Sequence, residues 1–207
     1  PAPAGGPATD DAGLLLTLGL ADAGLVTARL ALAPGGHAIV AGPPRSGRTT
    51  TLRVLATAAA SLGVSVIVVT RDRSGWTGTP PDAAVIIDPA GDPSPSILEC
   101  RGTLLVLVDD ADLTADDHPV LARLATERRP GRHVVAAARA DRLRGLYGHW
   151  TRELRADRTG VLLLPDPDVD GDLLGVRLPR TPSVGPAPGR GWLTGGAPEG
   201  FVQVAQP

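Results

Sequence analysis

Apolar residues along the chain fall into short, nearly continuous runs separated by segments with helical periodicity. The runs that predict strands are His37–Ala41, Val64–Thr70, Ala83–Ile87, Thr103–Val108 and His133–Ala138. Helical patterns cover Arg48–Leu62 and His118–Arg128. Strands without polar alternation are typical of a parallel sheet with helices on both faces, because neither strand face meets water. We therefore expect an α/β fold with a central parallel sheet.

The two ends of the chain have a different character. Residues 1–13 are Pro, Ala, Gly and Asp without periodicity and predict a linker, so one domain is expected over residues 14–207. After the fifth strand the pattern predicts a helix at Arg142–Asp157, a strand at Gly160–Leu164 and short strands at Leu173–Leu178 and Gly200–Ala205. Surface loops are expected at Ser74–Asp82 and Pro179–Gly191. The sequence thus predicts a β-rich C-terminal extension.

Composition restricts the class of protein further. The 207 residues hold 20 arginines, no lysine and one cysteine, with a formal net charge of -2. This balance disfavours a broadly basic nucleic-acid surface, and the single cysteine favours a reducing cytoplasm. No apolar run approaches the roughly 18 residues of a membrane span. The chain has no methionine and begins at Pro1, so we expect it to be a fragment of a larger protein.

A glycine-rich turn joins the first of these strands to the following helix. Its residues are Gly42, Pro43, Pro44, Arg45, Ser46, Gly47, Arg48, Thr49 and Thr50. The spacing fits the phosphate loop Gly-x-x-x-x-Gly-Lys-Ser/Thr, with Arg48 in place of lysine. Such a loop turns backbone amides and a helix N-terminus toward phosphate, and Thr49 would place its hydroxyl on Mg²⁺. The alternative is a strand-to-helix turn without a ligand.

Two acids end the strand at Thr103–Val108. In the corresponding Walker B arrangement the first acid, Asp109, holds the Mg²⁺ shell and the second, Asp110, orients the attacking water. The carboxyl ends of parallel strands face one crevice, so both acids are expected beside the phosphate loop. Taken alone, two acids after a strand also fit a loop start or a helix cap.

The order of the strands predicts a particular arrangement of the sheet. One strand, Ala83–Ile87, intervenes before the acidic strand, and another, His133–Ala138, follows it. That order is typical of the additional-strand, RecA-like P-loop NTPase fold. The tip of His133–Ala138 is then expected between the two motifs, with Arg139 in the sensor position.

These motifs resemble those of FtsK/SpoIIIE-type ATPases, and the last third resembles the C-terminal ATPase module of EccC-type proteins. The tail segments that carry the likeness are Thr159–Leu164, Asp170–Gly175, Pro188–Gly191 and Val202–Ala205. The resemblance implies ATP and Mg²⁺ as cofactors and a cytoplasmic module of a membrane-anchored type VII secretion ATPase. It also implies neighbouring ATPase modules as partners, a hexamer of the full-length protein, and docking of the C-terminal signal of a secreted substrate.

Three positions depart from active members, which carry lysine, glutamate and a polar sensor where this chain has Arg48, Asp110 and Arg139. Arginine lacks the compact ammonium, and Asp110 is one methylene short. We expect slow or absent hydrolysis, with nucleotide binding weak or lost, and a regulatory or substrate-recognition role. The open alternatives are a DNA-translocating motor module and a competent ATPase.

Several further residues have a structural explanation beside, or in place of, a chemical one. Arg152, Arg155 and Arg158 fit either arginine fingers toward a neighbouring module, with Arg155 as the candidate, or a solvated basic helix face. The run Asp166–Gly171 starts like a calcium loop, but position twelve is Arg177. The tryptophans are expected to pack in the core or at its edge, and Cys100 to be a small buried hydrophobe. His118 is expected to begin its helix.

Overall fold

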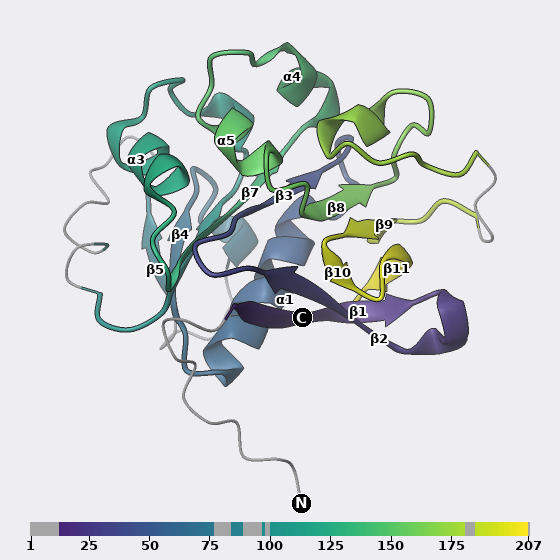
Figure 1. The fold of residues 1–207 in the computed structure, drawn as a ribbon, viewed down its shortest axis with the longest axis horizontal. Coiled ribbons are helices and arrows are strands. Elements are labelled where there is room, and N and C mark those ends of the chain that lie inside the picture. The colour runs from purple at the N-terminus through teal and green to yellow at the C-terminus, as the bar shows by residue number, and fades with distance from the viewer. Residues whose placement is uncertain (1–12, 77–83, 89–96, 98–99, 181–184, 207) are drawn as a thin grey trace, which may run out of the picture.

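The structure is a computed structural model that describes residues 13–76, 84–88, 97, 100–180 and 185–206. Residues 1–12 of the predicted linker and parts of both predicted loops lie outside the described residues. In the described chain eleven strands form one sheet in the order β10-β2-β1-β11-β9-β8-β3-β7-β6-β4-β5 (Figure 1). No described helix has the length and apolarity to cross a membrane.

One half of the sheet is parallel and contains every strand predicted before Arg139. Its members are β3 Ala38–Ala41, β4 Ser65–Val69, β5 Ala84–Ile87, β6 Leu104–Val108, β7 Arg132–Ala138 and β8 Gly160–Leu163. β7 pairs with β3 on one side and with β6 on the other. The additional-strand order is therefore confirmed.

The other half of the sheet is antiparallel and joins the two ends of the chain. Its members are β1 Leu14–Ala21, β2 Thr27–Leu32, β9 Arg190–Thr194, β10 Gly196–Ala197 and β11 Gly200–Val204. β1 pairs with β11, and β9 pairs with β8. The exposure of β1 alternates, with Leu14, Leu16 and Leu18 buried, as expected when one strand face is covered and the other meets water.

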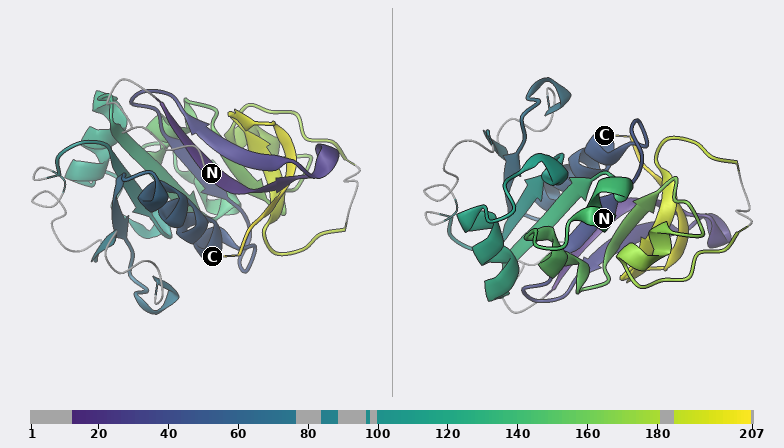
Figure 2. Two further views of the ribbon diagram at one scale, coloured as in Figure 1. Left: turned by 90° about the horizontal axis from the view of Figure 1, so that it is seen from below. Right: turned by 90° about the horizontal axis from the view of Figure 1, so that it is seen from above.

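Helices cover both faces of the sheet (Figures 1 and 2). The α-helices are α1 Arg48–Ser61, α3 Pro119–Glu127, α4 Ala140–Gly145 and α5 Thr151–Arg155. Short 3₁₀ turns lie at η1 Ala23–Leu25, η2 Ser74–Trp76, η3 Ala111–Leu113 and η4 Asp170–Leu173. α1 packs with Val40 and Leu107 in one apolar cluster, while α3, α4 and α5 pack with Ile39 and Val106 in the other. Successive residues of a strand thus pack into the apolar clusters on opposite faces of the sheet.

Three sequence predictions about the C-terminal third are wrong. The helix expected at Arg142–Asp157 is two short helices, interrupted where Gly145 and Gly148 weaken helix propensity. The strand expected at Leu173–Leu178 is instead η4 followed by an irregular segment, because Gly175 turns the backbone at φ 64°. The loop expected to run to Gly191 ends earlier, since β9 begins at Arg190.

The residues assigned to packing mostly behave as expected. Trp150 is buried, and Trp192 packs edge-to-face on Phe201 at a ring-centroid distance of 5.1 Å. His118 caps the N-terminus of α3, where its ring nitrogen accepts a bond from the amide of Leu121. Cys100 is only half-buried, at the border of the second core cluster.

Candidate functional site

The predicted phosphate loop connects the carboxyl end of β3 to the first turn of α1. The amide of Gly42 donates to the Ala138 carbonyl at 3.3 Å, which ties the loop to β7. Gly47 has φ 101°, a conformation that L-residues rarely adopt. A Cβ on Gly42 would lie 2.6 Å from Ser46 Oγ. Glycine is therefore required at both positions by the turn itself.

The C-terminal part of the chain lies directly against this loop. We call residues 185–190 the strap. Within it, the amide of Gly189 donates to the Ser46 carbonyl at 2.8 Å, and its carbonyl accepts from the amide of Val204 in β11. A Cβ on Gly47 would lie 3.1 Å from the Gly189 nitrogen. The antiparallel half of the sheet thus braces the loop, and apart from the glycine at position 189 no motif indicates this contact.

The two residues predicted to hold Mg²⁺ lie together. Thr49 Oγ1 donates to Asp109 Oδ2 at 2.8 Å, and the Asp109 side chain is almost fully buried. Burial raises the pKa of the Asp109 carboxyl, while the Thr49 hydrogen bond opposes that shift and the nearby Asp110 charge adds to it. A divalent cation between these oxygens would favour the ionised carboxylate.

Trp76 is a site residue that sequence reasoning assigned only to packing. Its indole nitrogen donates to Asp109 Oδ2 at 3.4 Å, and the residue is buried. η2 carries it, and a Cβ on the neighbouring Gly75 would contact the Thr49 methyl at 3.5 Å. The segment after β4 therefore forms a wall of the predicted metal position, which neither motif nor spacing indicates.

Arg48, in the lysine position, is bonded within the site. Its Nη1 donates to the carbonyls of Gly42 and Pro43, each at 2.9 Å, and its Nη2 donates to Asp110 Oδ1 at 3.0 Å. The side chain is 14% exposed, and its buried Nε has no partner among the described residues. The positive charge at the lysine position is therefore already paired with the second acid.

Asp110 occupies an unusual backbone conformation for an aspartate. Its φ and ψ are both 48°, in the left-handed region, and its side chain is 49% exposed. This turn places the carboxylate on the Arg48 guanidinium. The predicted water-orienting acid thus lies at the site, but as half of an ion pair.

Arg139 lies at the tip of β7, between the two motifs as predicted. Its side chain forms two bonds with the Asp141 carboxylate, Nε to Oδ1 at 3.0 Å and Nη2 to Oδ2 at 2.6 Å. With Pro43 and Pro44 it lines a pocket of about 330 Å³ beside the phosphate loop. The sensor position is therefore occupied by a charge that Asp141 neutralises.

Arg155 does not have the arrangement of an arginine finger. Its two terminal nitrogens donate to the carbonyls of Leu143 and Leu146, each at 3.1 Å, and burial lowers the pKa of its guanidinium. These bonds fasten α5 to the end of α4. Arg152 and Arg158 are the exposed members of the trio.

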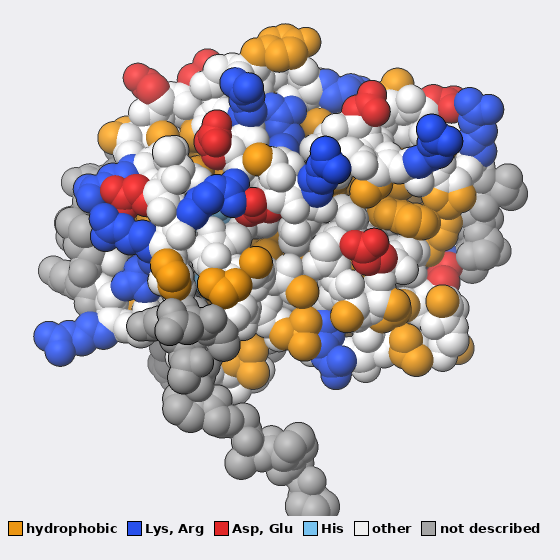
Figure 3. Space-filling view, in the orientation of Figure 1, with side chains coloured by type: hydrophobic (Ala, Val, Ile, Leu, Met, Phe, Trp, Pro, Cys, Tyr) orange, Lys and Arg blue, Asp and Glu red, His pale blue; other side chains and the backbone are white. Residues whose placement is uncertain are grey.

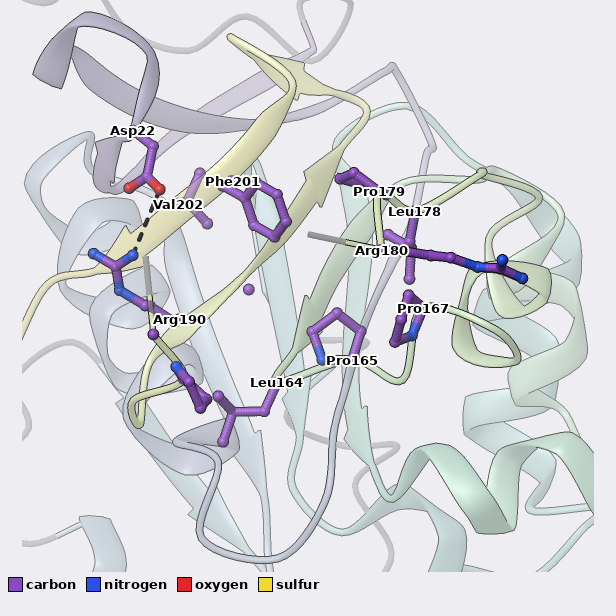
Figure 4. Close-up of a pocket in the computed structure, with 13 residues that line it drawn as sticks. Asp22, Leu164, Pro165, Pro167, Leu178, Pro179, Arg180, Arg190, Phe201 and Val202 are labelled. Carbon is purple, nitrogen blue, oxygen red and sulfur yellow. Dashed lines mark hydrogen bonds and ion pairs between the residues drawn. The ribbon is translucent and has the colours of Figure 1, made fainter. Parts of the chain in front are cut away.

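A second cavity, of about 170 Å³, adjoins the strap on the side away from α1 (Figure 4). Its walls are apolar, with the Phe201 ring and Leu178 facing the space, and Arg180 and Arg190 stand at its border. Arg190 pairs with Asp22 at 3.5 Å. The volume is close to that of an engineered cavity that takes up benzene, about 150 Å³, so it suits one ring or branched side chain.

The fit of a magnesium nucleotide can be judged from these groups. Thr49 and Asp109 have the oxygen ligands and the closeness that Mg²⁺ requires. The glycine turn is suited to phosphate oxygens, and so is the buried Ser46 hydroxyl, which has no hydrogen-bond partner in the described parts of the chain. Arg48 fits less well, because its guanidinium is engaged with the loop carbonyls and with Asp110. The residues suited to Mg²⁺ therefore lie together. The arginine expected to contact phosphate is instead bonded to the protein itself.

Fold and site together define a domain of the RecA-like P-loop ATPase fold. Comparison with solved structures agrees. ATPases 2 and 3 of EccC from Thermomonospora curvata, in complex with a signal sequence peptide, match 97% of this chain with a TM-score of 0.66 and 17% identity. ATPases 2 and 3 of EssC from Geobacillus thermodenitrificans match 96% with a TM-score of 0.69 and 16% identity. The conjugation coupling protein TcpA of pCW3, with ATPγS, matches 95% with a TM-score of 0.60 and 12% identity.

The resemblance to FtsK/SpoIIIE-like ATPases, and to EccC in particular, is thereby confirmed at the level of the fold. This chain spans 43% of the matched EccC structure, 42% of the EssC structure and 66% of the TcpA structure. No protein-family model matches the sequence, and a comparison with curated proteins finds no match.

Proposed function

We propose that this chain is an ATP-binding module of a type VII secretion ATPase that has lost efficient hydrolysis and serves as a regulatory or substrate-recognition unit. The observation that carries the proposal is the ion pair between Arg48 Nη2 and Asp110 Oδ1 at 3.0 Å. It joins the two positions on which phosphate contact and water orientation depend in this fold.

The chemistry of the two side chains supports the loss of hydrolysis. An arginine presents a planar fork that suits the carbonyls of Gly42 and Pro43, whereas a lysine reaches phosphate as a point charge. Asp110 is shorter than glutamate by one methylene, and a misplacement of about 1 Å can cost about 100-fold in rate. Nucleotide must also displace the guanidinium from Asp110 before Arg48 can contact it. Weak binding and slow turnover follow.

A turnover assay tests the loss of hydrolysis. We expect wild-type protein with Mg·ATP to release phosphate no faster than the Asp110→Asn variant. Both rates should lie far below the roughly 1–10³ s⁻¹ that is common among enzymes. Hydrolysis at ordinary rates that depends on Asp110 would establish a competent ATPase instead. Duplex DNA binding that weakens steeply with salt would favour the translocase alternative.

The recognition role is supported by the cavity beside the strap. The EccC structure named above contains a signal sequence peptide. In this chain the apolar cavity has room for one side chain, and its arginines suit backbone carbonyls or an acidic neighbour of that side chain. We infer that the cavity takes the apolar anchor of a substrate's C-terminal signal. The strap lines the cavity and is also bonded to Ser46, so a ligand in the cavity would contact a segment that touches the phosphate loop.

Calorimetric titration with the C-terminal peptide of a candidate secreted substrate tests this role. Phe201→Ala removes a ring from the cavity and should weaken binding by about tenfold, or about 1.4 kcal/mol. Tyr147→Ala removes an exposed ring elsewhere and should leave binding unchanged. Equal effects of the two variants would exclude the cavity as the anchor site.

A further inference from the structure

A positively charged hollow lies between the end of α5 and η4, outside the phosphate loop. Its volume is about 630 Å³, and the residues that define its chemistry are Tyr147, Arg152, Arg155, Arg158 and Asp172. None of these belongs to the loop, to Asp109 or to the cavity beside the strap. Figure 3 shows several basic side chains over the region of α4 and α5, with acidic side chains between them. The hollow is therefore a separate feature, independent of the proposed function.

The charge of this hollow is not balanced. None of the three arginines forms an ion pair with an acid in the described parts of the chain, although nine such pairs occur elsewhere in them. Asp172 is the one acid lining the hollow. Three guanidinium groups around one space repel each other, so a ligand that supplies negative charge would be favoured there.

One of the arginines is held in place by the backbone. Arg155 is fixed by the carbonyls of Leu143 and Leu146, and its buried Nε has no partner among the described residues. Arg158 lies against Gly175, where a Cβ would come within 3.2 Å of its Nε. The charge of Arg155 is therefore already ordered beside the hollow before an anion binds.

The geometry points to a binding site for a nucleoside phosphate in this hollow, with the exposed guanidinium groups of Arg152 and Arg158 on the phosphate and the charge of Arg155 behind them. Guanidinium forks match phosphate oxygens, and two exposed arginines line this one space, which suits a compact multivalent anion. Tyr147 is 81% exposed at the border and offers a ring on which a base can stack. The volume lies within the range of small-molecule sites, about 300–1,000 Å³.

Titration of the intact chain with pyrophosphate and with ADP, without Mg²⁺, tests the site. Arg152→Ala/Arg158→Ala should weaken the binding of both ligands by at least about tenfold. The control Arg29→Ala/Arg123→Ala removes the same charge from exposed positions elsewhere and should leave binding unchanged. Thermal unfolding of each variant by circular dichroism verifies that the exposed substitutions leave the fold intact.

Two further variants separate this site from the phosphate loop and identify the ligand. Arg48→Ala should preserve the binding that Arg152→Ala/Arg158→Ala removes. Tyr147→Ala should weaken ADP and not pyrophosphate. Absence of pyrophosphate binding at millimolar concentration, or equal losses in the charge-matched control, overturns the site. Equal responses of ADP and pyrophosphate to Tyr147→Ala overturn its assignment to a nucleoside.

Discussion

At the scale of single residues, the proposed loss of hydrolysis depends on what Arg48 contacts. An arginine in the lysine position keeps the charge, but here its terminal nitrogens are bonded to two loop carbonyls and to the Asp110 carboxylate. Because the Asp110 side chain is half-exposed, the pair contributes no more than about 1 kcal/mol. Substituting either residue of the pair should therefore free the other without unfolding the protein.

Restoring the residue types of active relatives should restore chemistry. In Arg48→Lys/Asp110→Glu the ammonium no longer spans the loop carbonyls and the second acid, and the longer acid can reach a water at the terminal phosphate. We expect phosphate release at least about tenfold above wild type. Steady-state release of phosphate from Mg·ATP measures this, with Arg45→Lys, an exposed loop arginine, as the control. A double variant as inactive as wild type would place the defect elsewhere in the site.

Asp109 and Trp76 show what sequence can and cannot give at this scale. The acid after an apolar strand is a local pattern, so its place beside Thr49 follows from the motif and the sheet. Trp76 follows no motif and reaches Asp109 only because η2 folds back over the site. Likewise, the pairing of Arg48 with Asp110 joins residues that are 62 positions apart. Such contacts depend on the loop conformation and are not encoded in spacing.

At the scale of elements, the phosphate loop is one part of a longer structure. Gly47 faces Gly189 of the strap, and Gly189 is bonded to β11. The loop conformation is thus set by α1, β7 and the C-terminal strands together. A side chain on Gly47 would meet the backbone of the strap, so the strap limits which residues the loop can carry there.

Gly47→Ala tests this bracing. The substitution places a side chain at φ 101° and a Cβ 3.1 Å from the Gly189 nitrogen. We expect it to lower the free energy of unfolding by about 2 kcal/mol. Gly145→Ala, at the end of α4 with open space around it, should be neutral or stabilise slightly. Urea unfolding compares them, and equal stability of the two variants would contradict the bracing.

The predicted and the missed elements differ in how local their signals are. β3 to β7 are short, continuous apolar runs, so the local sequence indicates each of them directly. β1 pairs with β11 across almost the whole chain, with Gly19 opposite Val204, and no local pattern specifies that partner. β9 was not predicted, because prolines and glycines around its start are typical of a loop. The antiparallel half of the sheet therefore lay beyond sequence reasoning, apart from the strand at its C-terminal end.

At the scale of the whole molecule, buried histidines at the opposite end of the sheet link stability to pH. His37 is buried, its Nδ1 accepts from the Val134 amide, and burial is the main cause that lowers its pKa to about 4. The Asp157 carboxylate opposes that shift, whereas Arg128 and His133 add to it. The imidazole is neutral in the fold and takes up a proton more readily once the chain unfolds.

Stability should consequently fall on acidification. The contribution of His37 to the free energy of unfolding is complete above pH 6.5, the ordinary pKa of histidine. It decreases by about 3 kcal/mol as the pH falls toward about 4. His37→Asn keeps an acceptor for the Val134 amide and cannot be protonated. We expect its free energy of unfolding to change less between pH 7 and pH 4 than that of wild type. Parallel pH profiles in the two proteins would exclude His37 as the titrating group.

The most direct test of the central claim is the affinity for Mg·ATP of wild type and Arg48→Lys, measured by isothermal titration calorimetry. If the guanidinium is held by the loop carbonyls and Asp110, wild type binds weakly and the lysine variant binds about tenfold tighter, a gain of about 1.4 kcal/mol. Tight wild-type binding that Arg48→Lys does not improve would show that Arg48 is free to hold phosphate, and would contradict the account.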